Sequence, residues 1–293
     1  MRRTLFLLAL ISISTPFATL HAEEAYSITP DVVYGHKSGM ALTFDVFTPK
    51  KEANGAAVLF MVSGGWHSRW SPPEKSASRF QPLLDKGFTV FAVRHGSSPK
   101  FNIPEAVSDV RNSVRYIRLH AKKFGVDESR MGVFGGSAGG HLSLVLGTTG
   151  DDGNKRTGKE KPVDTLSQTS SRVAAVVAFF PPTDIRPWTK ESSPYYTNYP
   201  ALQIDEKAAH DFSPRLHVSS DDPPTLLIHG DKDTLVPLEH SEKILPEFTK
   251  RKVPAELLVI KGAAHGFRGD DLVKANTALV KWFKKYLVGN AGE

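Results

Sequence analysis

The feature that most limits the fold is a glycine-rich turn around Ser137. A G-x-S-x-G pattern runs from Gly135 to Gly139, directly after the apolar run at residues 131–134 and directly before a helix-like run. In a sharp turn from strand to helix, the central residue takes strained backbone angles and its side chain is lifted above the sheet. The following amide, that of Ala138, lies at a helix N-terminus and can donate a hydrogen bond to an oxyanion. The pattern predicts a strand, a tight turn with Ser137 at its apex, and a helix.

Other apolar runs alternate with helix-like segments along the chain. Residues 28–34 and 42–47 alternate apolar and polar side chains, as half-buried antiparallel strands do. The later runs are almost continuously apolar, as in parallel strands covered on both faces, and comprise residues 57–62, 88–93, 131–134, 174–180, 225–229 and 256–260. This order predicts an α/β fold with a mostly parallel sheet of about eight strands and helices on both faces.

Helical periodicity appears in the intervals between these runs. Residues 104–124 carry apolar side chains three and four positions apart, which form one stripe along a helix. Further helices are expected at residues 238–250 and about 272–287. The other face of the 104–124 helix carries cations that we expect to be solvated: Arg111, Arg115, Arg118 and Lys122.

Two stretches interrupt the alternation. Residues 150–172 are polar and charged and are expected to form a surface loop or insertion. Residues from about 184 to 224 are rich in Pro, Ser and Tyr, and they lie where a cap over the carboxyl edge of the sheet could be inserted. We find no internal repeat and no linker, so residues 23–293 are expected to form one domain, as α/β folds of this length commonly do.

The N-terminal segment has the pattern of a secretory signal peptide. It has a basic start at residues 2–3, an apolar run at residues 5–13, and small or polar residues up to Ala22. The apolar run is shorter than the roughly 20 residues that a membrane span needs. We expect residues 1–22 to be removed, with Ala25 as the alternative limit, and the protein to be exported to the periplasm or the exterior without stable membrane insertion.

Composition excludes several kinds of site and partner. The chain has no cysteine, so disulfides, thiolate metal sites and a cysteine nucleophile are excluded. Its formal net charge is +6, but the Lys and Arg residues are dispersed and form no basic stripe with interleaved aromatics. Nucleic acid is therefore not an expected partner. The oligomeric state is left open.

A serine hydroxyl becomes a nucleophile only when a base accepts its proton. Among eleven histidines, His265 is the best placed, because it follows the last predicted strand in a loop of small residues. His141 competes, but it lies one helical turn after Ser137, whereas the turn points the serine above the helix N-terminus, so we interpret His141 as structural. Three other histidines near strand ends are interpreted in the same way: His67, His95 and His229.

The acid that orients the histidine is expected in the loop after residues 225–229. Asp231 and Asp233 compete for this role. Asp231 is close enough to the strand end to cap the turn, and Asp233 lies further out. Gly64 and Gly65 follow the strand at residues 57–62, where backbone amides could point at a substrate oxygen.

Taken together, these segments resemble the α/β-hydrolase serine esterases, in particular the group of carboxylesterases, acetylxylan esterases and prolyl-oligopeptidase catalytic domains. The resemblance covers essentially the whole chain after the N-terminal segment. Residues 135–142 match G-x-S-A-G-G-H-L, and residues 229–237 match H-G-x-x-D-x-x-V-P, which selects Asp233 over Asp231. Residues 63–66 are similar to the H-G-G-G-W loop of that family, and residues 262–267 to its histidine loop.

The resemblance implies a role for each matched position. The catalytic residues it implies are Ser137, Asp233 and His265, and the oxyanion-hole amides are those of Gly64, Gly65 and Ala138.

The sequence departs from the family in the oxyanion loop. Val62 stands where the family usually has histidine, and Ser63 stands where it has the first glycine. The imidazole normally helps to hold the loop, whereas the amides need no particular side chain.

The resemblance further implies hydrolysis of a small-molecule or carbohydrate ester through an acyl-enzyme, with no cofactor and no metal. Trp66, Trp70, Trp188 and the tyrosines near residue 196 could stack on sugar rings, as an acetyl or feruloyl ester of plant polysaccharide would require, or could pack a cap onto the sheet. Two alternatives remain open. One is a serine peptidase similar to prolyl oligopeptidase, and the other is a non-catalytic binding protein with a hydrolase fold.

Overall fold

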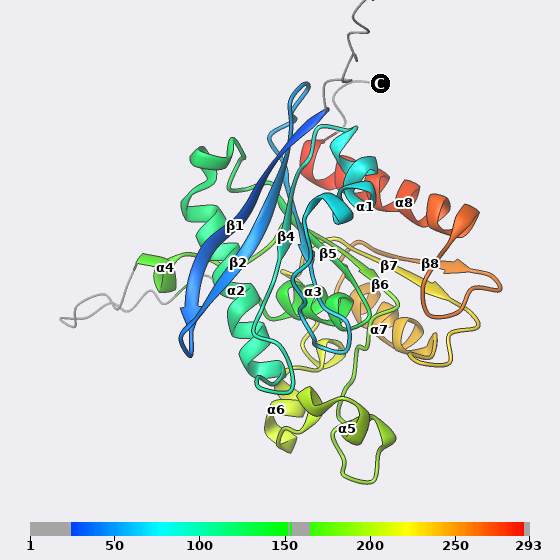
Figure 1. Ribbon diagram of the computed structural model, residues 1–293. Coiled ribbons are helices and arrows are strands. Elements are labelled where there is room, and N and C mark those ends of the chain that lie inside the picture. The colour runs from blue at the N-terminus through cyan, green and yellow to red at the C-terminus, as the bar shows by residue number, and fades with distance from the viewer. Residues whose placement is uncertain (1–24, 152, 154–164, 290–293) are drawn as a thin grey trace, which may run out of the picture.

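The centre of the molecule is one twisted sheet of eight strands in the order β1-β2-β4-β3-β5-β6-β7-β8 (Figure 1). The computed structural model describes residues 25–151, 153 and 165–289. β1 and β2 pair antiparallel, β2 and β4 pair antiparallel, and every later pairing is parallel. The strands are β1 (Tyr26–Lys37), β2 (Met40–Pro49), β3 (Ala57–Met61), β4 (Thr89–Val93), β5 (Met131–Gly136), β6 (Ala175–Phe179), β7 (Thr225–Gly230) and β8 (Ala255–Ile260). The α/β-hydrolase fold and the eight expected strands are thus confirmed.

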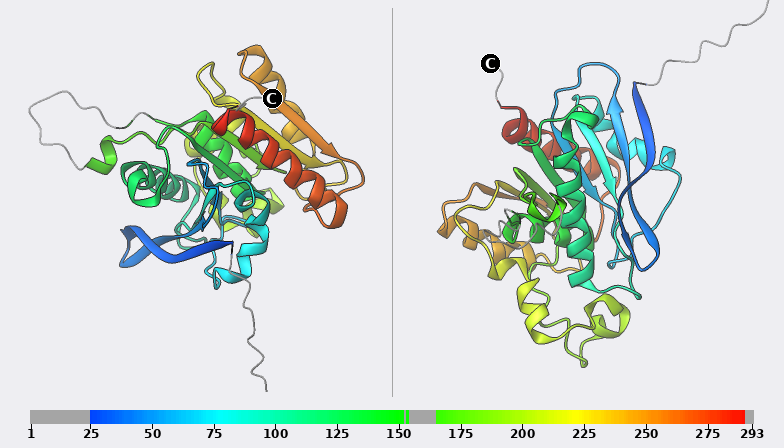
Figure 2. Two further views of the ribbon diagram at one scale, coloured as in Figure 1. Left: turned by 90° about the horizontal axis from the view of Figure 1, so that it is seen from above. Right: turned by 90° about the vertical axis from the view of Figure 1, so that its left-hand side faces the viewer.

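Helices cover both faces of the sheet (Figure 2). α1 (Glu74–Leu84) and α8 (Gly269–Phe283) pack on one face, and α2 (Ile103–Leu119), α3 (Ala138–Thr148) and α7 (Glu239–Lys250) pack on the other. Each face has its own apolar cluster, because the side chains of a strand alternate between the two faces. α1 was not predicted from the sequence. Short helical turns complete the description: Ala121–Phe124, α4 (Thr165–Gln168) and Lys284–Val288.

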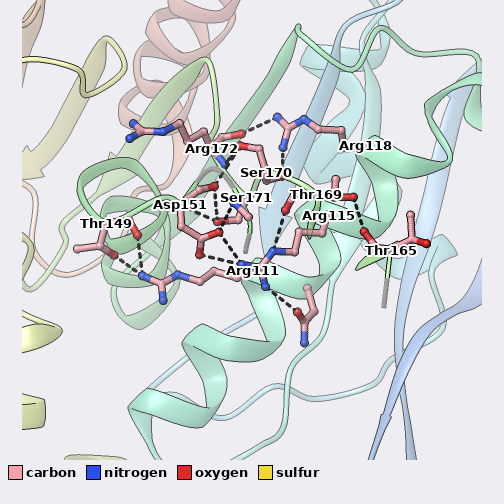
Figure 3. A network of polar contacts seen from close by, with 12 residues as sticks. Arg111, Arg115, Arg118, Thr149, Asp151, Thr165, Thr169, Ser170, Ser171 and Arg172 are labelled. Carbon is pink, nitrogen blue, oxygen red and sulfur yellow. Dashed lines mark hydrogen bonds and ion pairs between the residues drawn. The ribbon is translucent and has the colours of Figure 1, made fainter. Parts of the chain in front are cut away.

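Of the four cations expected to be solvated, Lys122, just beyond α2, is exposed as predicted, but the three arginines of α2 bind other segments of the chain, so the expectation for them was wrong (Figure 3). Arg115 forms an ion pair with Asp151 at 2.6 Å. Arg118 donates hydrogen bonds to two backbone carbonyls of the chain just before β6, and Arg111 donates to the carbonyl of Thr149 at 2.7 Å. Helical periodicity shows which face of α2 is apolar, but not which segment packs over the polar face. Part of the polar stretch after α3, residues 152 and 154–164, lies outside the described residues.

Residues 184–224, where a cap was expected, contain only short helices: α5 (Pro194–Asn198), Pro200–Leu202, α6 (Glu206–Asp211) and Pro214–Leu216. α5 and α6 protrude together at one end of the molecule (Figures 1 and 2). Trp188 and Tyr195 stack at 4.1 Å between ring centroids and form part of the interior of this segment. We refer to residues 184–224 as the cap segment.

The arrangement of the parallel strands determines where the site can form. β3, β5, β6, β7 and β8 are parallel neighbours, so their carboxyl ends meet at the same edge of the sheet. The loops that follow them carry every site residue predicted from the sequence. The predicted signal peptide, residues 1–22, lies outside the described residues. Within the described ranges, no helix combines the length and the apolar character that crossing a membrane requires.

Candidate active site

Ser137 occupies a strained turn between β5 and α3. Its φ of 55° and ψ of −121° lie in a region that non-glycine residues rarely adopt. The turn is closely packed, since a Cβ on Gly135 would lie 2.5 Å from the backbone of Gly139, and a Cβ on Gly139 would lie 2.6 Å from the carbonyl oxygen of Met61. The Ser137 amide donates to the carbonyl of Phe179 on β6 at 2.9 Å. The turn therefore has the geometry that the motif predicts, and it stands at the carboxyl edge of the sheet.

Asp233 and His265 form a direct hydrogen bond. Nδ1 of His265 lies 2.7 Å from Oδ2 of Asp233, and the Asp233 side chain is completely buried. Oδ1 of Asp233 accepts the amides of Leu235 and Val236, each at 2.9 Å. Because a carboxylate can only accept here, Nδ1 of His265 carries the proton and Nε2 has a free lone pair. The imidazole therefore has the tautomer that a general base requires.

Asp231, the competing acid, has a different role. Its Oδ1 accepts the amide of Gly262 at 2.6 Å, so it joins the turn after β7 to the turn that precedes His265. The position of Asp231 near the strand end explains this contact. The structure thus pairs His265 with Asp233, and Asp231 holds the histidine loop.

His229 supports the acid turn from inside the protein. Its ring is fully buried, Nε2 donates to the carbonyl of Val236 at 2.8 Å, and Nδ1 accepts from the hydroxyl of Ser241 at 2.8 Å. Burial lowers the pKa of His229, so the ring remains neutral. The same Nε2 lies 3.4 Å from Oδ2 of Asp233.

Among the described residues, no group of three or more His, Asp or Glu side chains is arranged to hold a metal ion.

Phe180 connects the serine turn with the histidine loop, and it was not predicted as a site residue. Its φ of 38° is again in the strained region. Its ring centroid lies 4.5 Å from that of His265, and a Cβ on Gly136 would meet the Phe180 ring at 3.1 Å. In the described structure, no hydrogen bond joins Ser137 to His265; in ligand-free sites such bonds often form only with substrate. The contacts of Phe180 place the two turns side by side.

The oxyanion loop after β3 is a tight turn in which the three predicted amides differ. The amide of Gly64 donates to the carbonyl of His67 at 3.0 Å, and the reverse bond has the same length. The Gly64 amide is therefore engaged within the loop. The Gly65 amide donates to no acceptor among the described residues. Ala138 is the first residue of α3, where an amide has no partner within the helix. Of the three predicted amides, those of Gly65 and Ala138 thus have no acceptor among the described residues.

The imidazole missing at position 62 is replaced by one from the neighbouring strand. Nε2 of His95, just after β4, lies 2.9 Å from the hydroxyl of Ser63, and Nδ1 lies 2.8 Å from the carbonyl of Gly96. A carbonyl only accepts, so Nδ1 carries the proton and Ser63 donates to Nε2. Burial lowers the pKa of His95 to about 4, which keeps the ring neutral near pH 7. His95 is a structural histidine, as interpreted, and it holds the loop at Ser63.

A second imidazole holds the other end of this loop. Nε1 of Trp66 donates to Nδ1 of His141 at 3.3 Å, while Nε2 of His141 donates to the carbonyl of Phe212 in the cap segment at 2.8 Å. His141 is fully buried, and this burial lowers its pKa to about 4. His141 thus has a structural role, as interpreted from its position in α3.

The aromatic side chains near the site pack mainly against protein. Trp66 and Trp188 are buried. The ring of Tyr199 lies against the oxyanion loop, since a Cβ on Gly65 would come within 2.9 Å of it. The hydroxyl of Tyr195 donates to the carbonyl of Leu235, in the acid turn, at 2.8 Å. Of the two uses open for these aromatics, packing accounts for Trp66 and Trp188, whereas Trp70 is exposed and donates to Asp31 at 3.1 Å. Tyr195 and Tyr199 are half-buried beside the site.

Comparison with known proteins connects this geometry to a family. The BD-FAE family model matches residues 44–248. Esterase LipC of Mycobacterium tuberculosis is 27% identical over 248 residues, which cover 80% of this chain and 59% of LipC. The chain thus spans about three-fifths of the length of this curated relative.

Solved structures are similar over most of the chain. A truncated form of a carbohydrate esterase from gut microbiota is 29% identical, with a TM-score of 0.73, covering 90% of this chain and 99% of that one. An acetyl ester-xyloside bifunctional hydrolase from Caldicellulosiruptor lactoaceticus is 23% identical, with a TM-score of 0.69, covering 87% of this chain and 92% of that one. At this lower identity the second likeness concerns the fold.

Proposed function

Because the chain belongs to the BD-FAE family, we propose that it is a serine hydrolase that cleaves carboxylic esters through an acyl-enzyme intermediate. The observation that carries the proposal is the pairing of a strained serine turn at Ser137 with the buried hydrogen bond between Asp233 and His265, at one edge of the sheet. The similarity to esterase LipC and to the carbohydrate esterase from gut microbiota supports it.

The mechanism follows from the donor and acceptor roles in the site. Nε2 of His265 accepts the proton of Ser137 as the serine oxygen attacks the ester carbonyl carbon. The imidazolium then donates this proton to the departing alkoxide, which leaves as an alcohol. Water, deprotonated by the same nitrogen, attacks the acyl-enzyme and releases the carboxylic acid and free Ser137. No cofactor takes part in these steps.

Two groups stabilise the charges that develop. Asp233 keeps the proton of His265 on Nδ1 and stabilises the imidazolium electrostatically. The amides of Gly65 and Ala138 are the donors proposed for the tetrahedral oxyanion. One donor of this kind contributes about 3 kcal/mol to the stability of the transition state in related chemistry.

For the substrate we propose an ester of a carbohydrate, such as an acetyl or feruloyl ester on plant polysaccharide. The carbohydrate esterase from gut microbiota, which the chain matches over nearly its whole length, supports this class. The half-buried rings of Tyr195 and Tyr199 beside the oxyanion loop offer apolar surface to a sugar.

Hydrolysis of a short-chain aryl acetate tests the reaction class directly. Ser137→Ala should lower kcat by at least about 10³-fold, because the nucleophile is lost while binding and oxyanion contacts remain. A panel of acetylated xylan, feruloyl esters and a prolyl peptide then separates carbohydrate esterase from peptidase. Activity that survives in Ser137→Ala, or cleavage of the prolyl peptide alone, would contradict the proposal.

We also propose that the protein acts outside the cytoplasm. The basic start, the apolar run at residues 5–13 and the small residues before Ala22 support this. N-terminal sequencing of the protein recovered from a secreting host should begin just after residue 22 or residue 25. Recovery of an intact N-terminus from the cytoplasm would contradict export.

A further inference from the structure

Two clefts open beside the serine turn and share one wall. The larger, of about 570 Å³, is lined by Gly135 and Gly136, directly before Ser137, and by Gly266 and Phe267, directly after His265. The smaller, of about 370 Å³, begins at Ser63 in the oxyanion loop. The residues common to both are Phe60, Arg79, Gly136 and Phe180. We call the two together the double cleft; its lining includes the residues directly before Ser137 and directly after His265.

Three cations border the double cleft without a charged partner. α1 contributes Lys75 and Arg79, and the loop before it contributes Arg69; all three side chains are exposed. Within the described part of the chain, none of them forms an ion pair or a hydrogen bond. Arg79 instead lies over the ring of Phe60, 5.2 Å from its centroid. Glu74, the neighbouring acid on α1, is outside the cleft lining and pairs with none of them.

The carboxylate in the described lining does not offset this charge. Asp45 is buried and accepts from Arg94 through both of its oxygens, one of them at 2.9 Å from Nη2. Arg94 also pairs with Asp31 at 2.7 Å, so this lining arginine is already bound to two carboxylates. Phe60 and Phe180 thus contribute aromatic surface to the double cleft, and three of its lining cations, Arg69, Lys75 and Arg79, pair with no carboxylate of the described residues.

We propose that the double cleft binds an anionic group on the substrate, close to the scissile ester. The group is a carboxylate, as in a uronic acid, or a sulfate on the sugar that carries the ester or on its neighbour. The guanidinium groups of Arg69 and Arg79 suit either anion, because the planar fork of a guanidinium binds two oxygens at once. The assignment rests on the proposed function, since the cleft is defined by its position beside Ser137.

The expected size of the effect follows from the exposure of the three cations. A single exposed ion pair contributes little, because water screens it. Three cations around one cleft act on the same anion, and they attract it over about 10 Å at moderate ionic strength. The anion should therefore affect kcat/KM chiefly through KM, and the effect should weaken as salt is added.

The kinetic test compares three acetylated oligosaccharides that differ in charge: one with a uronic acid, one with a sulfate and one neutral. For the wild type, kcat/KM should be higher for at least one anionic substrate than for the neutral one. The ratio of the anionic to the neutral kcat/KM, called here the charge ratio, should fall with salt. In Lys75→Gln/Arg79→Gln the charge ratio should fall about three- to tenfold. The matched control is Lys122→Gln/Lys250→Gln, which removes two exposed charges from the opposite face of the sheet and should keep the wild-type charge ratio.

The three substrates and the two double variants distinguish the two anions and can overturn the proposal. If kcat/KM exceeds that of the neutral substrate only for the uronic acid, the bound group is a carboxylate. If it does so only for the sulfated substrate, the bound group is a sulfate ester. Equal kcat/KM for all three substrates, or an equal fall in both double variants, overturns the assignment of the double cleft.

A binding measurement separates this inference from the reaction class. Ser137→Ala is titrated calorimetrically with a non-esterified uronic acid oligosaccharide and its sulfated counterpart, with and without Lys75→Gln/Arg79→Gln. Binding that weakens about three- to tenfold on removal of the two cations supports the cleft even if no ester is cleaved. Hydrolysis of aryl acetate without any such binding leaves the reaction class standing and overturns the cleft.

Discussion

At the scale of single residues, the hydrogen bonds of Asp233 define its contribution. One oxygen accepts two backbone amides and the other accepts His265, so the carboxylate both closes its own turn and fixes the imidazole. Asn at this position would still accept the amides, but its NH₂ group would face Nδ1 of His265 and favour the wrong tautomer.

Asp233→Asn should therefore lower kcat by about 10⁴-fold while the fold is retained. Steady-state kinetics on an aryl acetate, combined with a thermal unfolding curve, measures both quantities. A variant that keeps wild-type kcat would show that His265 does not depend on this carboxylate.

The hydrogen bond between Ser63 and His95 makes a second prediction at this scale. Ser63→Ala removes the donor, leaves a buried imidazole nitrogen unpaired, and frees the loop that carries Gly65. Because a fully lost oxyanion donor costs 10²–10³ in kcat, a loosened one should cost about tenfold, with little change in KM.

Ser63→Thr is the matched control, since it retains the hydroxyl and should restore most of kcat. The two variants are compared by steady-state kinetics on the same ester. Equal kcat in Ser63→Ala and the wild type would mean that the bond to His95 does not position the loop.

At the scale of secondary structure, the turn between β5 and α3 depends on close backbone contact. A Cβ on Gly139 would lie 2.6 Å from the Met61 carbonyl, a distance that only a backbone shift can relieve. Gly139→Ala should lower the free energy of unfolding by about 1–3 kcal/mol, and should lower kcat because Ser137 moves with the helix.

Gly35→Ala is the comparison variant, because its added Cβ would make an ordinary contact at 3.8 Å. Urea unfolding of both variants measures the difference. If Gly139→Ala were as stable and as active as Gly35→Ala, the close packing at the turn would not matter.

β1 and β2 were predictable because half-buried antiparallel strands alternate apolar and polar side chains, and the six later strands because buried strands are short, nearly continuous apolar runs. The helix α1 was not predicted; it contains Pro82 and buries only four of its side chains. The environment of the α2 arginines was also hidden, because it depends on a segment more than 30 residues away in the sequence.

The difference between local patterns and contacts with distant segments also explains which site residues could be predicted from the sequence. Ser137, Asp233 and His265 lie in local motifs, and the resemblance selected Asp233. Phe180 and His95 were not recognised as parts of the site, because their roles depend on which strand ends are neighbours in the sheet. The engagement of the Gly64 amide depends in turn on the closure of its own loop onto His67, which no motif specifies.

At the scale of the whole molecule, buried imidazoles couple stability to pH. Burial lowers the pKa of His95, His141 and His240 from 6.5 to about 4. Between these pH values the unfolded chain binds more protons than the folded one. The free energy of unfolding should be highest above pH 6.5 and should fall by about 1.4 kcal/mol per pH unit for each such histidine as the pH drops.

Urea unfolding at a series of pH values between 6.5 and 4 measures this slope. His141→Gln should reduce the slope by the contribution of one proton, whatever its effect on stability at neutral pH. A slope that is the same in wild type and His141→Gln would show that this imidazole is not held neutral by the fold.

The cap segment contacts three parts of the reaction centre at once. Tyr195 donates to the turn of Asp233, Tyr199 lies on the oxyanion loop, and the carbonyl of Phe212 accepts from His141. An evolutionary change in its length or sequence would therefore shift the chemistry together with the specificity. Selection for a new substrate could alter Lys75 and Arg79 of α1 more freely, since they border the double cleft and neither side chain forms a hydrogen bond or ion pair with the described residues.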